Sequence, residues 1–97
     1  MSRPRNRWYG EIKRRILSGD WEHPESFQDY LLMKAIYEAK QETIKLPNGS
    51  ERMKVITLVL MEGKTYIQAE RETFNSERNV QRWVTSFVNL VGKRAGY

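Results

Sequence analysis

The stretch that decides the fold covers residues 65–91 and reads TYIQAERETFNSERNVQRWVTSFVNLV. Thr65 and Gln68 have capping-box spacing, which predicts a short helix that ends at about Thr73. Phe74 and Asn75 predict a tight turn, and Ser76 is placed to cap a second helix. In that helix apolar residues recur with helical spacing, at Val80, Trp83, Val84, Phe87, Leu90 and Val91. A short helix, a tight turn and a longer amphipathic helix outline a helix-turn-helix over about residues 65–91.

The rest of the chain predicts three further helices and no strand. Apolar stripes indicate helices over about residues 6–18, 26–43 and 50–62. Asp20 to Glu25 is expected to be a loop, and Leu46-Pro47-Asn48-Gly49 a turn in which Gly49 takes a positive φ. Ser50 is then expected to cap the third helix. The predicted fold class is all-α: a small helical domain of about five helices, over residues 7–97, with a C-terminal helix-turn-helix.

Two expectations concern the core. Phe27, Leu31 and Ala35 define the buried stripe of the second helix, widened by Tyr30, Leu32, Ile36 and Tyr37. In the last helix Val80, Trp83 and Phe87 share one stripe and are expected to be buried against the third and fourth helices.

Composition limits the class of protein. The 97 residues carry 17 Lys and Arg against 12 Asp and Glu, a net charge of +5, with one His and no Cys. That length supports one domain, and the absence of Cys excludes disulfides and thiolate zinc sites. The longest apolar run is too short to span a bilayer, so no membrane partner is expected. Six basic residues and one acid lie in residues 1–15, and Lys or Arg exceed acids again in residues 46–97. This distribution is typical of proteins that bind a phosphate backbone.

The candidate DNA-binding side chains lie on the solvent face of the last helix. Counting 100° per residue from Val80 places Arg78, Arg82, Thr85 and Asn89 opposite the apolar stripe, with Gln81 and Ser86 on its flanks. These residue types read base edges: Arg pairs with guanine, and Asn or Gln with adenine. Glu77 is expected nearer the buried stripe. The alternative is an ordinary surface helix that carries two arginines.

The amino-terminal residues 1–6 are expected to form a flexible basic arm. Basic residues stand at every second position, at Arg3, Arg5 and Arg7. Such an arm can follow the phosphate backbone or enter a minor groove, or it can be a solubilising tail.

Catalysis and metal binding find little support. Asp20, Glu22, His23 and Glu25 form the one acidic cluster with a His, and they are typical of a solvated loop. His23 is the only histidine, so a nucleophile has no paired base. We therefore expect no enzyme activity, no cofactor and no metal.

The chain also resembles two known groups. Residues 63–84 are similar to region 4 of bacterial sigma factors, with matches at Ser76 and Val80 and with Asn79 in place of Thr. A closer similarity is to phage late-transcription regulators of the RinA and ArpU-like type. It rests on residues 7–10 (RWYG), 46–54 (LPNGSERMK) and 76–83 with Phe87, Leu90, Val91, Gly96 and Tyr97. Glu70 departs from the pattern, because such families carry Ala where the two helices cross; either Ala69 takes that role in a shifted register or Glu70 widens the crossing.

The residues and the resemblance together predict a sequence-specific DNA-binding transcription regulator, a phage or prophage late-gene activator in the cytoplasm of a bacterial host cell. Its partner is double-stranded DNA. Two alternatives stay open: a small-terminase-like protein that recognises DNA for packaging, and an adaptor that binds RNA polymerase through the acidic second helix. A homodimer is open as well, since helix-turn-helix proteins often bind paired half-sites.

Overall fold

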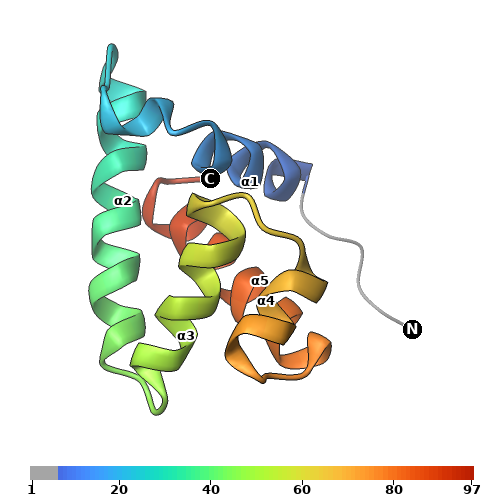
Figure 1. Ribbon diagram of the computed structural model, residues 1–97. Helices are drawn as coiled ribbons and strands as arrows, with labels where there is room; N and C mark the ends of the chain where they lie inside the picture. Colours follow the sequence, from blue (N-terminus) through green and yellow to red (C-terminus); the bar gives the residue numbers. More distant parts are fainter. Residues whose placement is uncertain (1–6) are drawn as a thin grey trace.

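The computed structural model describes residues 7–97, and every regular element in this part of the chain is helical (Figure 1). The α-helices are α1 (Arg7–Ser18), α2 (Phe27–Ile44), α3 (Gly49–Ile56), α4 (Tyr66–Thr73) and α5 (Glu77–Arg94). A three-ten turn, η1 (Asp20–Glu22), and a π-helical turn, η2 (Thr57–Met61), complete the order. The predicted all-α class with five helices is confirmed for the described residues.

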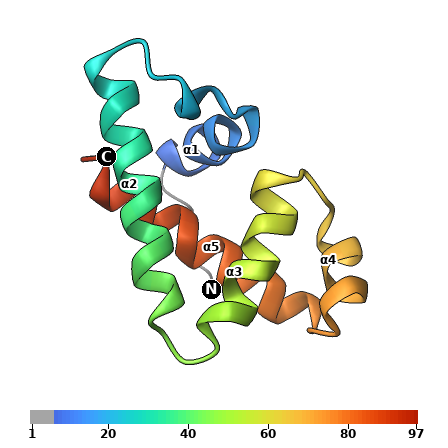
Figure 2. The ribbon, with the colours of Figure 1, turned by 60° about the vertical axis from the view of Figure 1, so that its left-hand side comes forward.

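Helix α5 runs through the middle of the molecule and packs against each of the other four α-helices. Figures 1 and 2 show α2 on one side of α5 and α4 on the other. One continuous hydrophobic core joins side chains from every element. Its largest fully buried member is Phe87 of α5. Because α5 touches every other α-helix, its orientation fixes which of its residues reach solvent.

Two helix starts follow the predicted caps, those of α4 and α5, and a third cap lies at the start of α2. Ser26 accepts a hydrogen bond from the Asp29 amide and caps α2. Thr65 and Gln68 form the reciprocal capping box of α4, with distances of 3.1 and 2.9 Å. Ser76 accepts a hydrogen bond from the Asn79 amide at the start of α5. Each cap satisfies a backbone N–H that the first helical turn leaves without a partner.

The start of α3 differs from the prediction. Asn48, not Gly49, has the positive φ of 59°, and Ser50 lies inside the helix rather than at its cap. Gly49 is needed for space instead. A Cβ at this position would lie 2.1 Å from the backbone oxygen of Ile44. The chain therefore turns from α2 into α3 by placing Gly49 directly against the end of α2.

The expected loop after α1 and the expected face of α2 were each wrong in part: Leu32, Ala35 and Ile36 are buried as predicted, but Leu31 is only half-buried. Residues 20–22 form η1, which buries Trp21 and lets its indole N–H donate to the Ile16 oxygen at 3.0 Å. In α2 the buried residues are Leu32, Ala35, Ile36, Ala39 and Thr43. Phe27 is 72% exposed, and Tyr30 and Tyr37 are exposed as well. Apolar residues surround α2, so periodicity alone did not select the face that the core covers.

The apolar run after α3 continues as the η2 turn. The Glu62 amide donates to the Thr57 oxygen, five residues back, at 2.9 Å. This wider turn brings the consecutive residues Leu58, Val59 and Leu60 into the core.

Candidate nucleic-acid interface

Helix α4 packs against α5, and its buried residues are Ala69 and Thr73. Ala69 is fully buried, whereas Glu70 is half-buried. Of the two residues between which the sequence left the register open, the buried one is therefore Ala69. Three residues, Phe74 to Ser76, join the two helices, so α5 emerges with one long face uncovered by α4.

The exposed face of α5 brings together most of the predicted DNA-binding residues. Arg78, Gln81, Arg82 and Ser86 are exposed and Thr85 is half-buried, and these five residues line one shallow depression. Asn89 is also exposed, outside the lining of the depression. Side chains that donate two hydrogen bonds in a plane, such as Arg and Gln, thus lie next to adaptable hydroxyl groups.

The two arginines of this face differ from Arg15 and Arg94, which are the arginines that form ion pairs within residues 7–97. Within residues 7–97 neither Arg78 nor Arg82 has a carboxylate oxygen within 4.0 Å. Arg94, on the same helix, pairs with Glu42, and this hydrogen bond raises its pKa. Burial acts to lower the pKa of Arg15, but hydrogen bonds with Tyr97 and Asp29 outweigh it and raise the pKa. The guanidinium groups of Arg78 and Arg82 are therefore available to bind an external anion.

Two neighbours modify the predicted face. Glu77 is exposed rather than close to the core, and the Gln81 amide donates to its carboxylate at 3.2 Å. An acid thus borders the face at the start of α5. The Tyr9 hydroxyl donates to Thr85 Oγ1 at 3.3 Å, which holds the Thr85 side chain against α1. Gln81 and Thr85 are therefore oriented by the protein, while Arg78, Arg82 and Ser86 are exposed and their side chains form no hydrogen bond with another residue of the described range 7–97.

The start of α1 lies beside the same helix. Trp8 packs so closely on α5 that a Cβ at Gly92 would lie 2.2 Å from its ring. Together with the Tyr9–Thr85 contact, this places the first turn of α1 next to the exposed face of α5. The side chain of Arg7 and the arm residues Arg3 and Arg5 lie outside the described side chains, so their predicted role stays a prediction.

Trp83 differs from the expected burial. It is half-buried and packs on the edge of the core, whereas Val80 and Phe87 are fully buried as predicted. The guanidinium carbon of Arg52, on α3, lies 5.5 Å from the centre of the Trp83 ring. This cation–π contact joins α3 to α5.

Phe74 has an unusual conformation in the turn between α4 and α5, although the sequence indicated it only as part of a turn. It ends α4 with φ 59° and ψ 26°, and its side chain is 95% exposed. The left-handed conformation disfavours a bulky residue. The dipeptide Phe-Asn before a capping Ser indicated the turn, but nothing in it indicated which residue adopts the positive φ.

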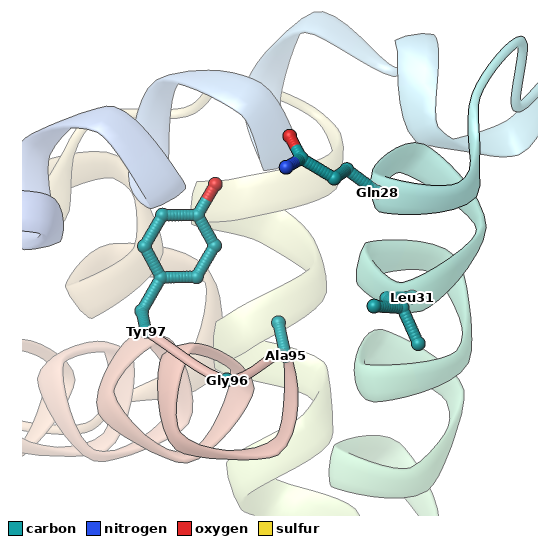
Figure 3. A pocket seen from close by; sticks show the side chains of 5 residues that line it. All are labelled: Gln28, Leu31, Ala95, Gly96 and Tyr97. Atoms are coloured by element: carbon teal, nitrogen blue, oxygen red, sulfur yellow. The ribbon is translucent and has the colours of Figure 1, made fainter.

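Two further depressions of the surface were considered as candidate sites. Figure 3 shows a pocket between α2 and the last residues of the chain, lined by Gln28, Leu31, Ala95, Gly96 and Tyr97. The Gln28 side chain extends toward the ring of Tyr97 (Figure 3), and none of the lining residues within the described range 7–97 is an acid or a histidine. Asp20, His23 and Glu25 line a separate depression. Within residues 7–97 no three potential ligand side chains are grouped to hold a metal ion.

Comparisons with protein-family models, with curated proteins and with solved structures gave no match. In the part of the chain that the structure describes, no helix is both long and apolar enough to cross a membrane. The α5 face is therefore identified as the candidate site from the exposure and the residue types of its side chains alone.

Proposed function

We propose that this protein binds double-stranded DNA sequence-specifically and regulates transcription, with α5 as the helix that enters the major groove. The observation that carries the proposal is the exposed α5 face, where Arg78 and Arg82 have no carboxylate partner among the described residues and lie beside Gln81 and Ser86. An α-helix fits the major groove, and these side chains match the donor and acceptor pattern of base edges.

Three further features support the proposal. Helix α4 packs against α5, and Arg78, Gln81, Arg82 and Ser86 stay exposed. The net charge of +5 favours association with a polyanion. The attachment point of the basic residues 1–6 lies beside the face, so that an arm starting there can contact the neighbouring backbone or minor groove. The role as a phage late-gene activator rests on the resemblance to RinA and ArpU-like regulators.

Arg82 is the residue that we assign to base reading. It stands one turn after Arg78, far enough into α5 for its guanidinium to reach O6 and N7 of guanine with two hydrogen bonds. Arg82→Ala is expected to cost about 1–3 kcal/mol on the specific site and to relax discrimination at one base pair. Helix content is expected to stay intact because the position is exposed and Ala favours helix.

The experiment first selects a preferred duplex from a random-sequence pool and then measures anisotropy titrations on that duplex and on its single-base variants. Arg82→Lys keeps the charge but loses the bidentate geometry, so it should retain affinity for random duplex and still lose the discrimination. Arg94→Ala removes one positive charge from the same helix at a carboxylate-paired position and is the matched control. Failure to select any preferred duplex, or equal losses for Arg82→Ala and Arg94→Ala, would overturn the proposal.

A further inference from the structure

A second surface of the molecule presents an ordered stripe that the DNA-binding proposal does not use. Along α2, six residues recur with alternating spacing of three and four: Phe27, Tyr30, Lys34, Tyr37, Gln41 and Ile44. All six are exposed. The set is called the α2 stripe below. Spacing of this kind is the a and d pattern of a helix that packs along another helix.

The α2 stripe lies directly opposite the core. Its residues are centred on one side of the helix, and the buried residues Leu32, Ala35, Ile36, Ala39 and Thr43 are centred about 180° away, counted at about 100° per residue. Figures 1 and 2 both show α2 along one edge of the molecule, with α4 at the opposite side of α5. A helix docked on the stripe therefore lies on the side of α2 that faces away from the core.

Neighbours hold the aromatic rings of the stripe in place. Phe27 and Tyr30 stack with their ring centres 6.4 Å apart. Tyr37 meets Trp21 edge-on at 5.9 Å, and the Lys40 ammonium lies 5.7 Å from the Tyr37 ring centre. Rings that are already ordered lose little side-chain entropy when a partner covers them.

The order of residues along the stripe makes it complementary to itself when the partner helix runs in the opposite direction. Phe27 then meets Ile44, Tyr30 meets Gln41, and Lys34 meets Tyr37, each pair occurring twice about a two-fold axis. Such reciprocity is what an isologous dimer requires. The apolar residues close the two ends, and the polar residues each face an aromatic ring.

Charge at the centre of the stripe fits the same arrangement. Within residues 7–97 no carboxylate oxygen lies within 4.0 Å of the Lys34 ammonium. In the antiparallel pair, each Lys34 lies level with Tyr37 and Glu38 of the other copy, which offer a cation–π contact and an ion pair. A parallel pair would instead set Lys34 against Lys34.

The area suits a reversible dimer. Phe27, Tyr30, Tyr37 and Ile44 are 72%, 47%, 49% and 49% exposed. With Lys34 and Gln41, the stripe offers on the order of 500 Å² per copy, a total near the lower limit of specific interfaces. From these observations we infer that the α2 stripe binds the α2 stripe of a second copy of this chain, antiparallel, with a dissociation constant in the micromolar range.

The first test is sedimentation equilibrium of the full chain from about 1 to 500 μM. The wild type is expected to pass from monomer to dimer. Lys34→Glu should raise the dissociation constant at least tenfold because it sets an acid level with Glu38 of the other copy. Tyr37→Glu should do the same because it removes, twice in each dimer, the ring that packs against Lys34 of the other copy, a loss larger than the gain from an exposed ion pair with that lysine. Ile67→Glu is the matched control because Ile67 is 53% exposed on α4, away from the stripe, and it should leave the constant unchanged. A wild type that stays monomeric, or a weaker dimer with Ile67→Glu and not with Tyr37→Glu, would overturn the inference.

The second test determines whether the two α2 helices run antiparallel or parallel. Because the natural sequence has no Cys, each introduced Cys is the only thiol in its chain. Tyr30→Cys and Gln41→Cys are oxidised separately and as a mixture, and the products are identified by mass spectrometry. An antiparallel pair sets the two positions level with each other but separates equal positions by about 16 Å at 1.5 Å per residue, beyond disulfide reach. The mixed product should form at least ten times faster than either self-linked product. Preferential self-linking of Tyr30→Cys would indicate a parallel pair and overturn the antiparallel stripe. DNA binding by Tyr37→Glu is measured in parallel, so that loss of the dimer is distinguished from loss of the α5 face.

Discussion

Replacement of Gly92 by Ala tests the contact that positions the first turn of α1 beside α5. Gly92 is buried in α5, and a Cβ built there lies 2.2, 2.6 and 2.8 Å from three atoms of the Trp8 ring. Real side chains do not approach so closely, so the ring must move by more than about 1 Å to restore contact at about 3.5 Å. The first turn of α1 is expected to move with it.

The magnitude follows from two opposing terms. Overpacking a well-packed site costs about 1–3 kcal/mol, and exchanging Gly for Ala inside a helix gains about 1 kcal/mol. We expect a net decrease in stability of about 1 kcal/mol, which lowers the melting temperature of a domain this size by about 4–8 °C. Gly10→Ala is the matched control in α1, because a Cβ at Gly10 meets no atom within 4 Å. That variant should gain up to about 1 kcal/mol.

The decisive measurement is a double-mutant cycle by urea denaturation, followed by circular dichroism in the far ultraviolet. Trp8→Ala removes the ring that Gly92→Ala would meet. In the Trp8→Ala background, Gly92→Ala should therefore change sign and stabilise the protein by about 1 kcal/mol, as Gly10→Ala does in the wild type. A Gly92→Ala variant that is stabilised in the wild-type background, or that is destabilised equally in both backgrounds, would refute the reasoning.

Three further predictions concern the arm and two turns. Deletion of residues 1–6 should weaken binding to all duplexes alike and reduce the slope of log affinity against log salt by about 0.9 for each phosphate that the arm neutralises; an unchanged slope in anisotropy titrations would contradict DNA binding by the arm. Gly49→Ala should cost more than about 1 kcal/mol, because the new Cβ would meet the backbone of Ile44 at 2.1 Å, and a wild-type urea midpoint would show that the turn from α2 to α3 adapts. Phe74→Gly should raise stability by up to about 1 kcal/mol, because it removes the left-handed penalty on a residue with φ 59° that is 95% exposed. A lower melting temperature would instead mean that the Phe74 ring holds the turn.

The features that the sequence predicted well depend on neighbours close in the chain. The capping box of Thr65 and Gln68 and the Ser76 cap each span three residues, so residue type and spacing are enough to place the start of a helix. The exposed face of α5 was predicted for the same reason, since the opposite face carries a continuous apolar stripe. Arg78, Gln81, Arg82 and Ser86 lie on the expected side as a result.

The features that the sequence did not predict depend on contacts between distant segments. The Tyr9–Thr85 hydrogen bond joins residues 76 positions apart. The residue types Tyr and Thr do not indicate which distant residue each will contact. The role of Gly49 was misread because its constraint is the volume occupied by Ile44 rather than its own φ. The burial of Trp21 likewise required the packing of η1 between α1 and α2.

Helix α2 shows most clearly what the sequence determined and what the tertiary structure decided. The sequence by itself determined that residues 27–44 form a helix, because their hydrogen bonds and caps are local. It also determined that apolar side chains would surround that helix. Only the tertiary structure decided which side faces the core, because α5 can cover just one side and small residues such as Ala35 and Ala39 allow the closest approach. The larger side chains Phe27, Tyr30 and Tyr37 were left to solvent as a consequence, and they form the stripe on which the inferred dimer depends.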